Sequence, residues 1–262
     1  MANEFVFDTD TAVTPDGPHL YRGHLHHRWT IGGVPNGGYA MSVMLQAARH
    51  ESRHPDPLTT TAHFLSPTGA GPVEIRSEGV KAGRSTSTIM LALHQEGRER
   101  IRMLTTLGEL SARTGPTHGY LAPPKLEGPF ETRRSQLLQE FPHNFEFRIP
   151  AAVAGGVFGE PTGHPEIGGT IAFADGRPPD LLCMPVIADG FAPVVFNLGY
   201  TNWTPTVEMT VHFWRNPSPG PLTVWLHSGV IEEGFHDESS DIWDSEGHLV
   251  ARSRQFAIIL SP

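Results

Sequence analysis

The stretch TTAHFL at residues 60–65 is matched later in the chain by MTVHFW at residues 209–214. Further pairs of residues keep nearly the same spacing, 149 or 150 positions, over about fifty residues, and a chance match would not preserve both order and distance in this way. The pairs are His63-Phe64 with His212-Phe213, Gly71-Pro72 with Gly220-Pro221, and Glu96-Gly97 with Glu246-Gly247. We therefore interpret the chain as two copies of one unit of about 110 residues.

Each copy is predicted to contain one buried helix followed by strands. In the first copy, Asn36 is a suitable N-cap for the apolar run that begins at Gly37-Gly38. In the second copy, Asp189 is the expected N-cap, and Pro193 falls in the first turn, where its missing N–H costs least. The segments with strand-like composition are 59–65, 73–80, 86–94 and 100–110 in the first copy, and 207–214, 222–230, 237–243 and 250–260 in the second. Short turns between neighbouring strands favour an antiparallel sheet that curls around the helix, and hence an α+β fold.

A segment rich in glycine and proline separates the two copies. Residues 111–128 include Gly115-Pro116 and Pro123-Pro124, which favour an extended connection over packed structure. We predict a first unit at residues 1–111, a linker at 112–140 and a second unit at 141–262.

The composition excludes several classes of function. The chain of 262 residues carries a formal net charge of −9, whereas binding to nucleic acid needs a basic surface. It has no apolar run of about 18 residues that could span a membrane, and its first residues, MANEFVFDTDT, lack the features of a signal peptide. Cys183 is the single cysteine, so no internal disulfide can form. We expect a cytoplasmic globular protein.

The histidines and acidic stretches do not form a recognisable metal site. His24, His26 and His27 lie close together, but the spacing typical of zinc sites, such as His-Glu-x-x-His, does not occur in the sequence. We therefore expect no bound metal. The acidic stretch at residues 232–238 is interpreted as a solvated turn.

The duplicated unit resembles the double hot-dog thioesterases, and among them the acyl-CoA thioesterase II type. In that family an aspartate begins the helix of the second unit, a threonine opens the next strand and a glutamine lies late in the last strand. The matching residues here are Asp189, Thr206 and Gln255, and Gly37-Gly38 matches the glycine pair at the start of the first helix. The resemblance implies that Asp189, Thr206 and Gln255 hold and activate a hydrolytic water, that acyl-CoA is the substrate, and that no cofactor is required.

These residue types suit hydrolysis of a thioester by water. A carboxylate can take a proton from water, and hydroxyl and amide groups can orient that water without titrating. The helix dipole would lower the pKa of Asp189 and apolar neighbours such as Phe191 would raise it, and the sequence leaves open which effect is larger. Backbone N–H groups at Gly37, Gly38 or Gly190 are candidate donors to the carbonyl oxygen as it gains charge.

The repeat predicts one competent site per chain. Asn36 stands where Asp189 stands in the other copy, while Pro57 and Thr105 take the places of the threonine and the glutamine. We expect Asn36 to cap its helix and to lie beside the acyl group, so that the first copy contributes helix surface to a site in the second.

Further residues are candidates for binding the substrate. The acyl chain is expected to lie between the two helices, against residues such as Met44 and Phe191. Arg84 and Arg215 are candidates for contacting the phosphates of the coenzyme. Sheet edges of this fold commonly pair between chains, so a homo-oligomer is also expected.

Two other functions stay open from the sequence. A hot-dog enoyl-CoA hydratase or dehydratase would need a histidine paired with an acid at the helix, and the segment around Asp189 contains no histidine. A noncatalytic acyl-CoA or lipid-binding protein would keep the apolar tunnel without turnover. Thiol release, hydration of crotonyl-CoA, and ligand protection without turnover distinguish the three functions.

Overall fold

The computed structural model describes residues 5–132 and 139–260. Within these residues, thirteen strands form one sheet in which every pairing is antiparallel. The strands of the first unit are β1 (Thr14–Pro15), β2 (Leu20–Leu25), β5 (Asp56–Phe64), β6 (Gly71–Ala82), β7 (Ser87–Gln95) and β8 (Arg98–Gly108), with β3 (Thr30–Ile31) and β4 (Val34–Pro35) forming a separate ribbon. The strands of the second unit are β9 (Phe145–Arg148), β10 (Glu166–Phe173), β11 (Thr206–Phe213), β12 (Leu222–His227), β13 (Ile231–Glu232), β14 (Phe235–Trp243) and β15 (Leu249–Ile258).

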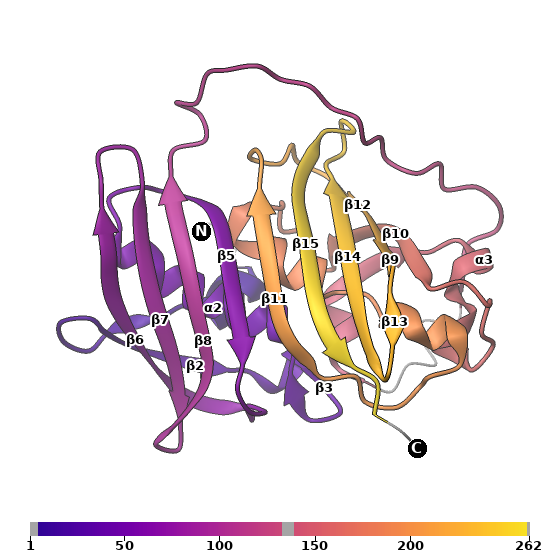
Figure 1. Ribbon diagram of the computed structural model, residues 1–262, viewed down its shortest axis with the longest axis horizontal. Coiled ribbons are helices and arrows are strands. Elements are labelled where there is room, and N and C mark those ends of the chain that lie inside the picture. Colours follow the sequence, from indigo (N-terminus) through magenta and orange to yellow (C-terminus); the bar gives the residue numbers. More distant parts are fainter. Residues whose placement is uncertain (1–4, 133–138, 261–262) are drawn as a thin grey trace.

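The two units join through their central strands, β5 and β11, which lie side by side in the middle of the sheet (Figure 1). Thr61 of β5 stands opposite Thr210 of β11, and their hydroxyl oxygens are 2.9 Å apart. These two threonines are also equivalent positions of the sequence repeat, 149 residues apart. Equivalent residues can face each other in this way only at a local two-fold axis, so the two copies are related by an approximate rotation about this point.

The expected α+β class is confirmed, and the strands predicted from the sequence correspond to β5 to β8 and to β11, β12, β14 and β15. Alternating burial along these strands explains the agreement, because one face of the sheet packs on the helices and the other faces outward. The part of the predicted linker up to residue 132 leaves the end of β8 and arches past the ends of the strands of the second unit (Figure 1). Residues 133–138 of that linker lie outside the described residues.

The first helix, α2 (Gly37–Glu51), is buried along most of its length. Asn36 is its N-cap, as predicted, and the side-chain oxygen of Asn36 accepts a hydrogen bond from the backbone N–H of Tyr39 at 2.8 Å. Gly38 lies against Pro185 of the second unit so closely that a Cβ atom at Gly38 would stand 2.1 Å from the carbonyl oxygen of Pro185. A glycine is therefore required for the two helical segments to meet.

The second helical segment differs from the prediction. The chain is helical over η5 (Leu181–Cys183) and α4 (Met184–Ala188), so Asp189 follows this helix instead of beginning one. Asp180 is the N-cap, since its side chain accepts a hydrogen bond from the N–H of Cys183 at 3.1 Å. Pro193 disfavours helical geometry at the residue before it, and the chain becomes helical again only as a short 3-10 turn, η6 (Val194–Leu198).

The remaining helical segments are short and lie around the sheet. They are α1 (Val6–Thr11), η1 (His27–Trp29), η3 (Phe141–Asn144), α3 (Ala151–Ala154) and η4 (Gly155–Phe158).

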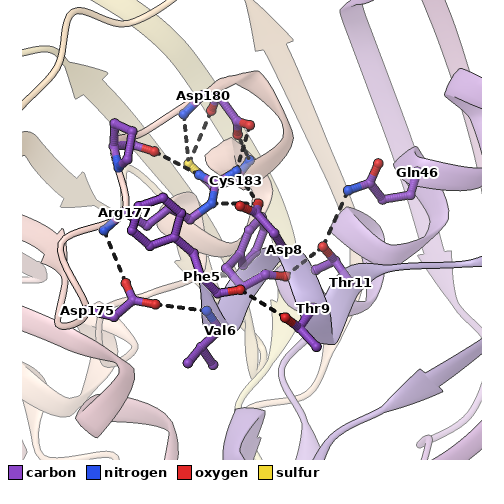
Figure 2. A network of polar contacts seen from close by, with 12 residues as sticks. Phe5, Val6, Asp8, Thr9, Thr11, Gln46, Asp175, Arg177, Asp180 and Cys183 are labelled. Carbon is purple, nitrogen blue, oxygen red and sulfur yellow. Dashed lines mark hydrogen bonds and ion pairs between the residues drawn. The ribbon is translucent and has the colours of Figure 1, made fainter. Parts of the chain in front are cut away.

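The N-terminal helix α1 attaches the first unit to the second through one arginine (Figure 2). The guanidinium of Arg177 lies 2.7 Å from carboxylate oxygens of both Asp8, in α1, and Asp180. It also lies over the ring of Phe7, with 4.8 Å between the guanidinium carbon and the ring centre. Arg177 is only 7% exposed, so a buried guanidinium joins segments about 170 residues apart.

Arg177→Met is expected to lower the free energy of unfolding by about 2 kcal/mol. The loss is smaller than for a fully buried ion pair because the side chains of Asp8 and Asp180 stay 47% and 43% exposed and can be solvated once the arginine is gone. Urea denaturation measures the change. Arg22→Met is the matched control, since Arg22 also contacts two carboxylates but is 55% exposed, and a similar loss in both variants would contradict the assignment.

Candidate active site

A cavity of about 850 Å³ lies where β5 ends and β11 begins, and both units line it. Most of its wall is apolar, and the polar side chains cluster on one part of it. The lining residues used below are Asn36, Gly37 and Phe64 from the first unit, and Asp189, Gly190, Phe191, Thr206, His236, Glu238 and Gln255 from the second. Such a volume is typical of a small-molecule site.

Asp189 is bound to the start of the helix of the other unit. Its Oδ2 atom accepts hydrogen bonds from the backbone N–H of Gly38 at 3.0 Å and from the side-chain amide of Asn36 at 2.8 Å. The same Asn36 amide nitrogen donates to the backbone oxygen of Asp189 at 2.9 Å. The prediction that Asp189 caps its own helix is therefore wrong, because the carboxylate instead satisfies the free N–H groups at the N-terminus of α2.

Burial raises the pKa of Asp189 to about 6, even though hydrogen bonds from Gly38, Gln255 and Asn36 act in the opposite direction. This answers the question that the sequence left open, since desolvation outweighs the favourable dipole of α2. A carboxyl group with such a pKa is ionised at neutral pH and is a stronger base than an exposed aspartate.

Thr206 and Gln255 lie in the same cavity as Asp189, so the structure brings the three candidate catalytic residues together. Thr206 opens β11, and its hydroxyl donates to the side-chain oxygen of Gln255 at 2.8 Å. The side-chain nitrogen of Gln255 donates to a carboxylate oxygen of Glu238 at 2.7 Å. Glu238, Gln255 and Thr206 thus form a short hydrogen-bonded chain that ends at a hydroxyl in the cavity.

Glu238 was not identified from the sequence. It falls in the acidic stretch interpreted as a solvated turn, and that interpretation is wrong for this residue, which lies in β14 and is 4% exposed. The turn itself is made by Glu233, with φ +48°, and Gly234. The repeat could have indicated that Glu238 is buried, because an offset of 149 aligns it with Ile89, a buried position of β7.

The three glycines take different positions at the site. Gly37 lies between Phe64 and Asp189, and a Cβ atom there would stand 2.9 Å from the Phe64 ring. The N–H of Gly38 is bound to Asp189, and the N–H of Gly190 is bound to the backbone oxygen of Ile187 at 3.2 Å. Of the predicted backbone donors, Gly38 and Gly190 are thus already engaged within the protein.

The structure places only some of the predicted substrate-binding residues at the cavity. Phe191 lines the cavity, whereas Met44 is fully buried in the core and does not belong to the described residues that line it. Arg215 follows the far end of β11, about 30 Å of extended chain from Thr206, and Arg84 lies in the turn at the far end of β6. Both arginines are exposed at the end of the sheet away from the cavity, because the strand register carries them there. Within the described lining of the cavity there is no lysine or arginine.

The described part of the chain contains no group of three or more histidine, cysteine or acidic side chains placed to hold a metal ion. Among its helices, none combines the length and apolar character needed to cross a bilayer.

Comparisons with known proteins identify the family of the chain. The family profile of the acyl-CoA thioesterase N-terminal domain matches residues 25–108, and that of the acyl-CoA thioesterase C-terminal domain matches residues 120–259. The structure is similar to that of a candidate thioesterase II from Thermobifida fusca YX, with a TM-score of 0.90 and 29% identity, covering 100% of both chains. A hot dog fold protein of unknown function from Alicyclobacillus acidocaldarius shares the fold with a TM-score of 0.88 and 22% identity over 99% of both chains.

An uncharacterized protein of Mycobacterium tuberculosis is 27% identical over 92% of this chain and 91% of its own length. The two family profiles together cover most of the residues, in the order that the duplicated units require. The chain therefore belongs to the acyl-CoA thioesterase family and is a thioester hydrolase with a double hot-dog fold.

Proposed function

We propose that this thioesterase hydrolyses acyl-CoA by direct attack of a water molecule, with Asp189 as the general base and with Thr206 and Gln255 holding the water in place. One observation carries the proposal. These three residues are far apart in the sequence, yet they line the same polar part of a mainly apolar cavity.

The chemical steps need no covalent enzyme intermediate. The water oxygen attacks the thioester carbonyl carbon while Asp189 takes one proton from the water, which gives a tetrahedral intermediate with a negative oxygen. The positive end of the α2 dipole faces this region and favours that charge. The carbon–sulfur bond then breaks, the proton passes from Asp189 to the departing thiolate, and the products are a carboxylic acid and CoA.

The apolar wall supports an acyl group as the part of the substrate that enters the cavity. Phe64 and Phe191 lie on opposite units and both contact the cavity beside Asp189. We place the reacting carbonyl at the polar group of side chains and the hydrocarbon part along the apolar wall. The coenzyme then extends outward from the cavity.

Thiol release from acyl-CoAs of increasing chain length tests this function. We expect saturable release of CoA with an optimum at one range of lengths, because the cavity has a fixed volume. His236 also lines the cavity, so hydration of crotonyl-CoA is measured beside hydrolysis. Hydration without thiol release, or binding of acyl-CoA without turnover, would reject the proposal in favour of a hydratase or a binding protein.

Thr206→Val is expected to lower kcat by about 10- to 100-fold, with little change in KM, because the water loses one of its positioning partners while the acyl wall is unchanged. Thr210→Val is the matched control on the same strand, since Thr210 bonds to Thr61 on the outer face of the sheet. Equal activity of the two variants would exclude the role of Thr206.

Three finer proposals accompany this function. The single, buried cysteine supports a cytoplasmic location. The sheet ends at β1 and β9, whose outer edges would allow pairing between copies in a homo-oligomer. The end of β8 at Gly108 supports a first unit at 1–111, with the linker at 112–140 and the second unit at 141–262.

A further inference from the structure

A second buried carboxyl group, Glu238, lies at the end of the hydrogen-bonded chain that includes Thr206. One of its carboxylate oxygens, Oε1, accepts from Gln255 Nε2 at 2.7 Å, and the other, Oε2, accepts from the backbone N–H of Val194 at 2.8 Å. Both oxygens are thus engaged, although neither bond takes part in the attack of water on the thioester.

The hydrogen bonds around Gln255 run in one direction. Ionised carboxylates can only accept, and both Glu238 and Asp189 accept from Gln255, so the Gln255 side chain turns its NH2 group toward them and its oxygen toward Thr206. The Thr206 hydroxyl then donates to Gln255 Oε1, at 2.8 Å. Since a hydroxyl has one hydrogen, the lone pairs of the Thr206 oxygen remain available to a molecule in the cavity.

This direction suits a nucleophilic water. A water that donates one hydrogen to Asp189 and the other to Thr206 keeps its own lone pair for the carbonyl carbon. If the Gln255 amide were reversed, Thr206 would accept from it and would point its hydrogen into the cavity. That hydrogen would bind the lone pair of the water and make the water a poorer nucleophile.

The first copy of the repeat provides an internal comparison. Glu238 stands opposite Gln255 in the β14–β15 pair, and Ile89 stands opposite Thr105 at the equivalent place in the β7–β8 pair. Ile89 is buried in the core there. The sheet therefore accepts an apolar residue at this position, and the fold alone does not require a carboxyl group that is costly to bury.

We propose that Glu238 is a positioning residue, which together with Asp189 fixes the direction of the hydrogen bonds through Gln255 so that Thr206 presents its lone pairs to the attacking water. The inference rests on the proposed hydrolytic function. Glu238 acts through Gln255 and does not itself touch the reacting atoms.

Protonation of Glu238 would oppose this direction, because only Asp189 would then still accept from the Gln255 NH2 group. Because Oε2 must accept from Val194, the added proton would sit on Oε1 and face the Gln255 NH2 group, which favours turning the Gln255 oxygen toward Glu238 and away from Thr206. Burial, and to a smaller degree the charges of Asp189 and Asp237, raise the pKa of Glu238 to about 7. The other titratable or charged groups nearby are His236, which lines the same cavity, and Arg254, which lies 3.5 Å from Asp237.

The pH dependence of kcat tests the proposal without any substitution. If both Asp189 and Glu238 must be ionised, log kcat should fall below about pH 6 with a limiting slope of two per pH unit, whereas one required carboxylate gives a slope of one. The rate is followed by the loss of thioester ultraviolet absorbance, because colour reagents for thiols depend on pH. A limiting slope of one in the wild-type enzyme would overturn the proposal.

Glu238→Gln provides the second test. The new amide must turn its oxygen toward the N–H of Val194, so its NH2 group faces the NH2 group of Gln255 and favours the reversed Gln255 side chain. We expect kcat to fall about 100-fold with KM little changed and the limiting slope reduced to one. Glu208→Gln is the control, since it makes the same chemical change on β11 at a residue outside the described lining of the cavity. If Glu238→Gln does not fold, Glu238→Ile, which copies the first unit, takes its place.

The outcomes separate the two proposals. Wild-type kcat and an unchanged pH profile in a folded Glu238 variant would reject the positioning role alone. An active Asp189→Asn variant would instead reject the hydrolytic proposal itself, whatever Glu238 does.

Discussion

Asp189→Asn is expected to lower kcat for acyl-CoA hydrolysis about 1000-fold, the scale of a lost general base. Asparagine has the same shape, and its side-chain oxygen can still accept from the N–H of Gly38 and from Asn36. It cannot take a proton from water, so the attack on the thioester loses its base. Thiol release and acyl-CoA binding are measured together, and binding should be retained.

The same substitution is expected to stabilise the protein at alkaline pH. Since burial raises the pKa of Asp189 from 3.8 to about 6, the folded state holds this proton more tightly than the unfolded state does. The resulting stability is present below about pH 4 and is lost as the pH rises through about 6. Above that pH the buried charge costs about 3 kcal/mol, and asparagine avoids this cost.

Asp237→Asn is the control for this pH effect, because its expected sign is opposite. Burial acts to raise the pKa of Asp237, but hydrogen bonds from the N–H groups of Val230 and Gly229 outweigh it and lower the pKa. Losing that carboxylate should therefore destabilise the protein above about pH 4. Equal stability changes for Asp189→Asn at pH 5 and pH 8 would contradict the burial of an ionisable group at this site.

Gly38→Ala is expected to destabilise the fold by about 3 kcal/mol or more and to lower kcat about 100-fold. The added carbon would meet the backbone oxygen of Pro185 at 2.1 Å and the Asp189 Cβ atom at 2.9 Å. Backbone atoms cannot turn aside, so α2 and α4 would have to separate, and the Gly38 N–H would move away from Asp189. Thermal unfolding and thiol release measure the two effects.

Two other glycines act as controls for this contact. In Gly37→Ala the nearest atoms belong to the Phe64 ring, at 2.9 Å, and a side chain can move, so the loss should be smaller. A Cβ atom at Gly79 would have no neighbour within 4 Å, and Gly79→Ala should be nearly neutral. Alanine ordinarily favours a helix over glycine by up to about 1 kcal/mol, so a net loss at Gly38 can only come from the clash.

The strands and the first helix could be predicted because their signals are local. Alternating apolar residues and paired turn residues specify the sheet, and Asn36 before an apolar run specifies the start of α2. The same rule failed at Asp189, because an N-cap works only where the residues after it can form a helix. Gly190 and Pro193 prevent a regular helix there, while Asp180 is followed by a sequence that is compatible with one.

The site was only partly predictable for a different reason. The candidates Asp189, Thr206 and Gln255 were found through the order and spacing of a family pattern. Arg84 and Arg215 were placed at the substrate by residue type alone, and the strand register carries both to the far end of the sheet. Glu238 was missed because an acidic stretch suggests exposure, although its position in the repeat is a buried one.

An approximate rotation axis passes between Thr61 and Thr210, and a pair of identical subunits would obey such an axis in every residue. In that pair any inherited change would appear in both clefts at once. Here the two halves are encoded separately, so a mutation can introduce a carboxyl group in one half while the equivalent residue of the other half stays apolar, as at Glu238 and Ile89. Covalent fusion thus permits division of labour, with one half specialised for chemistry and the other for support.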